Sequence, residues 1–92
     1  DNKKPTQFNL LQNYPNPFNP STTIRYNIGE PGQVKLTIYT ITGQEVAMLI
    51  NEQNNAGEHV VFFDAKMLPS GMYYYRLKTG NQVATKKMLL VK

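Results

Sequence analysis

The chain has 92 residues, of which 40% are hydrophobic, and it contains no cysteine. This length fits one domain with a single modest core. The absence of cysteine excludes disulfides and thiolate metal sites, and no apolar run approaches the roughly 20 residues of a membrane helix. The polar start, DNKKPTQ, lacks the apolar core of a signal peptide. We interpret residues 1–7 as the end of a linker and residues 8–92 as the domain.

The net charge of +4 is unevenly distributed along the chain. Residues 1–64 carry four basic and six acidic side chains, whereas residues 65–92 carry six basic ones and no acidic one. The C-terminal third therefore suits an acidic partner. It also suits a solvated basic edge strand that resists aggregation, and charge alone favours this second interpretation.

The first half of the chain contains four predicted strands, identified by alternation of apolar and polar residues. We expect a short strand in QFNLLQ, then strands in TTIRYNI and QVKLTIY, separated by the turn EPG. The segment QEVAMLINEQ also fits a helical face, but QNNAG ends it so soon that we predict a strand. The expected inward residues of the two longer strands are Ile24, Tyr26, Ile28, Val34, Leu36 and Ile38.

Three further strands are predicted in the second half, in HVVFFD, GMYYYRLK and VATKKMLLVK. His59 and Phe63 share one face of the first, and Tyr73, Tyr75 and Leu77 share one face of the second. TGNQ is a strong hairpin signal, and the last strand is expected to run to the end of the chain. Seven short strands with Gly or Pro between them predict an all-β sandwich or barrel of antiparallel strands.

The stretch NYPNPFNPS, residues 13–21, holds three of the six prolines. Proline has no N–H group, so this stretch cannot be a central strand, and each residue before a proline is biased toward extended backbone. We expect a stiff crossing that pins Phe18 into the end of the core. Asparagine side chains there can satisfy backbone groups that the prolines leave open.

The residues that could carry chemistry are few. His59 is the only histidine; it lacks further ligands at suitable spacing for a metal and is expected to be structural. Neither a catalytic triad nor a phosphate-binding loop is indicated, so we expect no enzyme, no metal and no cofactor. Three tyrosines beside Arg76 and Lys78 permit nucleic-acid stacking, but alternation spreads those rings over both faces. Carbohydrate binding stays open, although the chain has no tryptophan.

Four motifs occur in order: Pro-Asn-Pro-Phe (Pro15, Asn16, Pro17, Phe18), YTITG ending at Gly43, AGEH containing Gly57, and SGMY containing Gly71 and Tyr73. Together they make residues 8–92 resemble the type A C-terminal sorting domain of the bacterial type IX (Por) secretion system. Many relatives carry Trp where Phe63 stands, and Phe fills the same core role. The neighbouring immunoglobulin-like domain of flagellar hook-capping proteins, an assembly module, is the alternative. The Pro-Asn-Pro-Phe start and the basic last strand favour the sorting domain.

The resemblance implies a seven-stranded antiparallel immunoglobulin-like β-sandwich that works as a non-enzymatic export signal. The implied partners are the type IX translocon, a cell-surface sortase and an upstream cargo in the same polypeptide, with no nucleic acid and no membrane insertion. The cargo would cross the periplasm to the cell surface, where the domain is typically removed and the cargo released or joined to anionic lipopolysaccharide. The recognition signal maps to Gly71, Tyr73, Lys86, Lys87 and Lys92.

Two of these residues have structural interpretations as well. Tyr73 follows a corner, LPSG, and resembles the tyrosine corner of immunoglobulin domains. Gly71 is expected to adopt a backbone conformation that other residues resist. The last strand is expected to expose an edge that can add to a partner's sheet.

Overall fold

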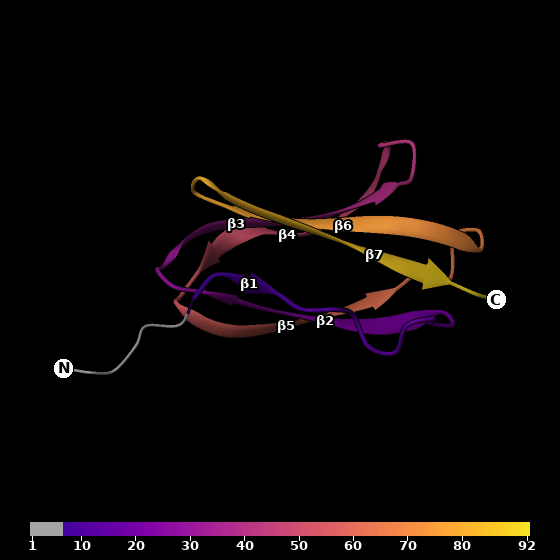
Figure 1. Cartoon of the computed structure of the whole chain (residues 1–92), viewed down its shortest axis with the longest axis horizontal. Coiled ribbons are helices and arrows are strands. Elements are labelled where there is room, and N and C mark those ends of the chain that lie inside the picture. The colour runs from indigo at the N-terminus through magenta and orange to yellow at the C-terminus, as the bar shows by residue number, and fades with distance from the viewer. Residues whose placement is uncertain (1–6) are drawn as a thin grey trace.

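The computed structural model describes residues 7–92, which form two packed antiparallel sheets (Figure 1). Its strands are β1 (Asn9–Leu10), β2 (Ser21–Ile28), β3 (Gly32–Thr40), β4 (Glu45–Asn54), β5 (Gly57–Asp64), β6 (Gly71–Thr79) and β7 (Gln82–Leu90). The predicted all-β fold of seven antiparallel strands is confirmed, and it agrees with an immunoglobulin-like sandwich. No helix long enough to cross a membrane occurs between residues 7 and 92. Residues 1–6 of the predicted linker end lie outside the described part.

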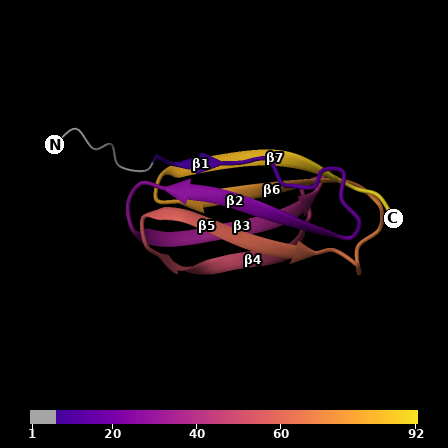
Figure 2. The same ribbon diagram turned by 90° about the horizontal axis from the view of Figure 1, so that it is seen from below.

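The two sheets have the strand orders β1-β2-β5 and β4-β3-β6-β7. Because β4 pairs with β3 along its length, the interpretation of QEVAMLINEQ as a strand is correct. The last strand, β7, pairs only with β6 and is therefore an edge strand of the larger sheet. The edge strand β1 of the smaller sheet runs beside β7 (Figure 2).

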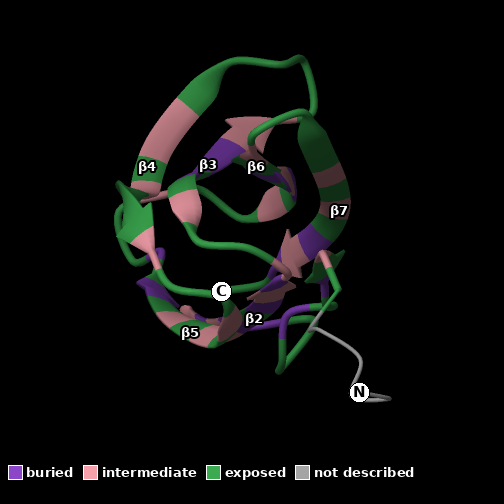
Figure 3. Cartoon of the chain, turned by 90° about the vertical axis from the view of Figure 1, so that its left-hand side faces the viewer, coloured by how far each residue is buried: buried purple, intermediate pink, exposed green. Residues whose placement is uncertain are grey.

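The core lies between the sheets and includes the predicted inward residues. Strands β2, β3 and β6 bury alternate side chains, as pleated geometry requires. Strand β4 adds only half-buried side chains such as Leu49 and Ile50, and Figure 3 shows this mixture of buried, intermediate and exposed positions. Buried hydrophobic residues are Leu10, Phe18, Ile24, Tyr26, Ile28, Val34, Leu36, Ile38, Phe63, Ala65, Tyr73, Tyr75, Leu77, Met88 and Leu90. The opposite faces of the strands remain in solvent, which leaves large side chains such as Phe62 exposed.

The structure corrects the bounds of the first and last predicted strands. The first is only two residues long, because after the Leu11 amide donates to the Arg25 carbonyl at 3.0 Å the regular ladder with β2 ends. The chain then pairs with β2 at an isolated bridge between Tyr14 and Thr23. The last ends at Leu90 and not at the end of the chain. Its partner there is Gly71, the first residue of β6, so no β6 backbone remains to continue the ladder.

The proline-rich stretch leads from β1 to β2 and places Phe18 in the end of the core, as the sequence suggested. Its contact with the edge of β7 was not predicted. Its three X–Pro bonds, at Pro15, Pro17 and Pro20, are cis. Phe18 is 2% exposed, and the centre of its ring lies 6.2 Å from that of Phe63. The buried Asn13 amide donates to the Pro15 carbonyl oxygen at 3.1 Å. An asparagine side chain thus satisfies a backbone group within the proline run.

Candidate recognition surface

The edge of β7 that does not pair with β6 is covered in its C-terminal half by residues 12–18. We call these residues the capping segment. The Leu89 amide donates to the Asn16 side-chain oxygen at 3.0 Å, and the Leu89 carbonyl accepts from the Phe18 amide at 2.9 Å. The Val91 amide in turn donates to the Phe18 carbonyl at 2.9 Å. The Pro-Asn-Pro-Phe motif therefore acts as a short surrogate strand, which blocks this half of β7 from pairing with another chain.

The N-terminal half of the same edge has no strand hydrogen-bonded to it within residues 7–92, although β1 runs beside β7 (Figure 2). Backbone groups of alternate strand residues point to the same side, so Val83 and Thr85 face the edge that Leu89 faces. Within residues 7–92, neither forms a backbone hydrogen bond outside the β6–β7 ladder. Val83 is 53% exposed. We call these two positions the open edge, because their outward backbone groups have no such hydrogen bond.

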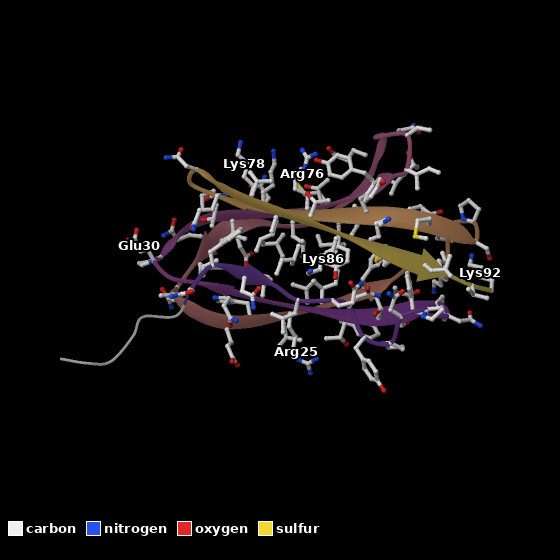
Figure 4. All side chains as sticks on the ribbon, viewed as in Figure 1. Arg25, Glu30, Arg76, Lys78, Lys86 and Lys92 are labelled. Carbon is white, nitrogen blue, oxygen red and sulfur yellow. The ribbon has the colours of Figure 1, made fainter. Side chains whose placement is uncertain are left out.

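The three lysines predicted for recognition do not form one cluster. Lys87 lies opposite Tyr74 of β6, and its side chain is exposed on the outer face of the sheet. Lys86 lies opposite the buried Tyr75 and therefore points to the other side of β7, level with the space between the sheets in Figure 4. Lys92 lies at the far end, where its ammonium donates to the Lys66 carbonyl at 2.6 Å. Strand alternation and the end of β7 separate the three.

Gly71 and Tyr73 lie at the corner that begins β6. Tyr73 is 5% exposed, and its hydroxyl donates to the Pro69 carbonyl, four residues upstream, at 2.6 Å. This bond has the geometry of a tyrosine corner. Gly71 has a φ of 152°, which side-chain-bearing residues rarely adopt. Tyr73 offers almost no surface to a partner, and both residues shape the corner.

The other glycines of the family motifs also lie at turns and strand ends. Gly43 has a φ of 95° in the turn between β3 and β4, where its amide donates to the Thr40 carbonyl at 2.9 Å. Only glycine adopts such a backbone readily. Gly57 is the first residue of β5 and pairs with Ile28.

The outer face of the larger sheet carries two rows of side chains. Local sequence patterns did not predict that these side chains are neighbours. In one row Tyr39, Tyr74 and Lys87 are neighbours across three strands, and in the other Lys35 lies opposite Lys78. Between the rows, the Arg76 guanidinium carbon lies 5.0 Å from the centre of the Tyr39 ring. Figure 4 shows Arg76 and Lys78 on the side of the sheet turned away from the sandwich. We call these six residues the basic face.

A shallow groove lies within the basic face. It encloses about 400 Å³ and is lined by Tyr39, Gly43, Tyr74, Arg76 and Thr85. A second hollow of about 250 Å³ lies along the same sheet, with Lys35 and Lys78 on its walls. Sequence reasoning missed this surface because β3 and β6 are far apart in the chain, and only their pairing places Lys35 beside Lys78 and Tyr39 beside Tyr74.

The only histidine has structural contacts. Its ring stacks on Tyr26 with centres 5.2 Å apart, and its Nε2 is 2.7 Å from the Asn55 carbonyl oxygen, to which it donates. No group of three His, Cys, Asp or Glu side chains in residues 7–92 could hold a metal ion. His59 therefore belongs to the packing between β2 and β5.

A model of the family described as "Secretion system C-terminal sorting domain" matches residues 12–92. The chain belongs to this family. The match begins with the capping segment and includes β7, so it covers the surface described above. The sorting domain is a C-terminal secretion signal of type IX secretion cargo, which implies export to the cell surface or the extracellular space.

A solved structure supports the fold of the sorting domain. The crystal structure of dimeric latent PorU from Porphyromonas gingivalis aligns with a TM-score of 0.70 and 22% sequence identity, over 99% of this chain and 10% of that chain. The sorting domain thus spans about a tenth of the PorU chain. No curated protein matches the sequence.

Proposed function

We propose that the type IX translocon reads this sorting domain in its folded state, through β7, and thereby exports a cargo that precedes it in the polypeptide. The observation that carries the proposal is the half-covered edge of β7. The capping segment restricts pairing to the open edge at Val83 and Thr85, and Lys87 is exposed close by.

The positions of the β7 residues support recognition of the domain in its folded state. Met88 and Leu90 are 1% and 0% exposed in the core, while the backbone of Leu89 is bonded to the capping segment. An unfolded terminal peptide has neither arrangement. The translocon would therefore recognise a strand whose position is set by the rest of the sandwich.

The open edge offers main-chain donors and acceptors to an added strand. Lys87 would steer an acidic partner and fix the register, because its exposed ammonium follows the open edge by two residues. Lys86 and Lys92 face other directions and would contribute less. Gly71 and Tyr73 would act by holding the corner against which the end of β7 is placed.

The cell-surface sortase is the second proposed partner. Cleavage would fall in residues 1–7 or before them, because the chain from β1 onward is part of the sandwich. The cargo would then be released or attached to the surface, and the sorting domain itself carries out no catalysis. This step uses no contact of the basic face.

Export of a reporter tests the proposal. The 92 residues are fused behind a reporter and expressed in a host with a type IX system and in a mutant without it. We expect surface or medium localisation in the first host alone. Equal export in both hosts would contradict the proposal and favour an assembly module that is not a sorting signal.

Variants at the open edge test the mode of recognition. In Thr85→Pro the outward N–H is lost, and edge strands tolerate proline there, so the domain folds but export falls. Thr85→Val keeps the N–H and is the control. Normal export of folded Thr85→Pro would exclude strand addition. Deletion of residues 88–92 is less informative, because it removes Met88 and Leu90 from the core.

A further inference from the structure

We propose that the basic face binds an anionic polysaccharide. This activity goes beyond export, because the face extends over the outer side of the larger sheet, although it shares Lys87 with the proposed recognition surface and its groove reaches Thr85 of the open edge. Its six residues combine three lysines, one arginine and two tyrosines on three neighbouring strands. The ligand class is a glycan that carries carboxylate or sulfate groups.

The arrangement of positive charges on the basic face favours binding of an anion. Lys35 of β3 lies directly opposite Lys78 of β6, and the outer partners of this pair are Asn51 and Val83. Like charges directly opposite each other in a sheet are destabilising, and the register supplies no carboxylate to offset them. A bound anionic group between the two ammonium groups would remove this repulsion.

Arg76 supplies a second anion-binding position, about 7 Å further along the strand, since residues two apart are separated by that distance. Its guanidinium group lies over the Tyr39 ring, a contact that holds the side chain in place. A guanidinium group held in this way can donate two parallel N–H bonds to one carboxylate or sulfate group. Tyr74 lies two residues from Arg76 along β6, and its neighbour on β7 is Lys87. The cations thus follow a line along β6.

The groove offers the complementary apolar contact. Tyr39 and Tyr74 line it together with Arg76 and the hydroxyl-bearing Thr85. Sugar rings present flat C–H faces that pack on aromatic rings, and hydroxyl groups that bond to polar side chains. In the neighbouring hollow, Gln33 donates to Asn51 at 2.9 Å, so two amides also face the ligand.

The composition of the face favours a glycan over other polyanions. Lysine is depleted from the centres of protein interfaces, yet three lysines are present here. Binding of single-stranded nucleic acid needs successive stacking aromatic rings, whereas Tyr73 and Tyr75 are buried and leave only Tyr74 of that run outside. Export to the cell surface or beyond also places the face among extracellular polymers.

Affinity electrophoresis of the 92-residue chain tests the inference, with polygalacturonate in the gel as the probe. We expect retardation by polygalacturonate that weakens with salt, and none by neutral dextran. The variant Lys35→Gln/Arg76→Gln/Lys78→Gln should bind at least about tenfold more weakly, because charge-assisted hydrogen bonds are lost. The matched control Lys66→Gln/Lys86→Gln/Lys92→Gln removes the same charge elsewhere and should change binding by less than about twofold.

Two outcomes overturn the inference. If both triple variants lose binding equally, net charge and not the face is responsible. If polyglutamate or a single-stranded oligonucleotide is retarded as strongly as polygalacturonate at equal charge, the face does not select a glycan. Neither outcome affects the proposed function, because export of the reporter is measured separately. Conversely, export that is independent of the type IX system would leave glycan binding intact.

Discussion

The hydroxyl group of Tyr75 accepts a hydrogen bond from the backbone nitrogen of Asn13 at 2.7 Å and donates one to the Leu11 carbonyl at 2.7 Å. Tyr75 lies in the middle of β6 and is 0% exposed, whereas Leu11 and Asn13 belong to the irregular chain after β1. One buried side chain of the larger sheet therefore anchors the start of the capping segment. The core and the covered edge of β7 are linked through this contact.

Substitution of Tyr75 by Phe should lower the free energy of unfolding by about 1–3 kcal/mol, because the Asn13 amide and the Leu11 carbonyl lose a buried partner. Urea denaturation measures the change. Tyr74→Phe is the control, because its side chain is on the outer face and should stay within about 0.5 kcal/mol of the wild type. Equal stability of Tyr75→Phe and wild type would mean that the two hydrogen bonds are replaced by water.

Alkaline pH should destabilise the domain through the same residue. Burial raises the pKa of Tyr75 to about 12, although the hydrogen bond from Asn13 lowers it in part. In the unfolded chain the phenol ionises near its ordinary pKa of 10.0, so rising pH stabilises the unfolded state first. Stability is unaffected below about pH 10 and falls by about 2–3 kcal/mol through pH 12.

Urea midpoints between pH 9 and pH 12 measure this dependence, and Tyr75→Phe should show a smaller slope. Part of the slope will remain, because burial, and to a lesser extent Glu52, also raises the pKa of Tyr26. An unchanged slope in Tyr75→Phe would contradict the assignment to Tyr75.

The strands and the core could be predicted from the sequence because both depend on local alternation. Ile24, Val34 and Tyr75 lie inside as their patterns indicate, since a strand with one buried face must repeat its apolar residues with period two. The role of the prolines was also accessible, because a missing N–H is a property of each residue. The ends of the strands were harder to predict from local patterns, because β7 ends where its partner β6 begins.

The candidate surface depends on pairings that local patterns do not contain. The family resemblance placed Lys86 and Lys87 together in the recognition signal, yet consecutive strand residues point to opposite faces. Lys35 lies in residues 1–64, which carry a net negative charge, and joins the basic face only through β3–β6 pairing. The covering of β7 depends on contacts more than 70 positions apart in the chain.

Asn16 should stabilise the covered edge of β7. Asn16→Ala removes the acceptor for the Leu89 amide and should cost about 1 kcal/mol of unfolding free energy. Hydrogen exchange measured by NMR should show faster exchange of the Leu89 amide in this variant. Asn19→Ala is the matched control, because no side-chain hydrogen bond of Asn19 occurs in the described part of the chain. Unaltered Leu89 exchange would show that the capping segment holds without this contact.

Tyr73 should act on stability and not on recognition. Tyr73→Phe removes the bond to the Pro69 carbonyl and should lower the unfolding free energy by about 1 kcal/mol. Export of the folded reporter fusion in the type IX host should stay at the wild-type level, because the side chain is buried. A loss of export without a loss of stability would instead assign Tyr73 a direct contact with the translocon.

Phe18 should carry the largest energetic contribution of the proline-rich stretch. It is 2% exposed and packs near Phe63, while its backbone bonds to Leu89 and Val91. Phe18→Ala leaves a cavity at the end of the sandwich and should lower the unfolding free energy by about 3–5 kcal/mol. Tyr14→Ala is the control, because Tyr14 is 74% exposed and its substitution should change stability by less than about 0.5 kcal/mol.

Similar stabilities of the two variants in urea would contradict the anchoring of the stretch through Phe18. A large loss for Phe18→Ala alone would show that the motif maintains the end of the core and, through it, the position of β7.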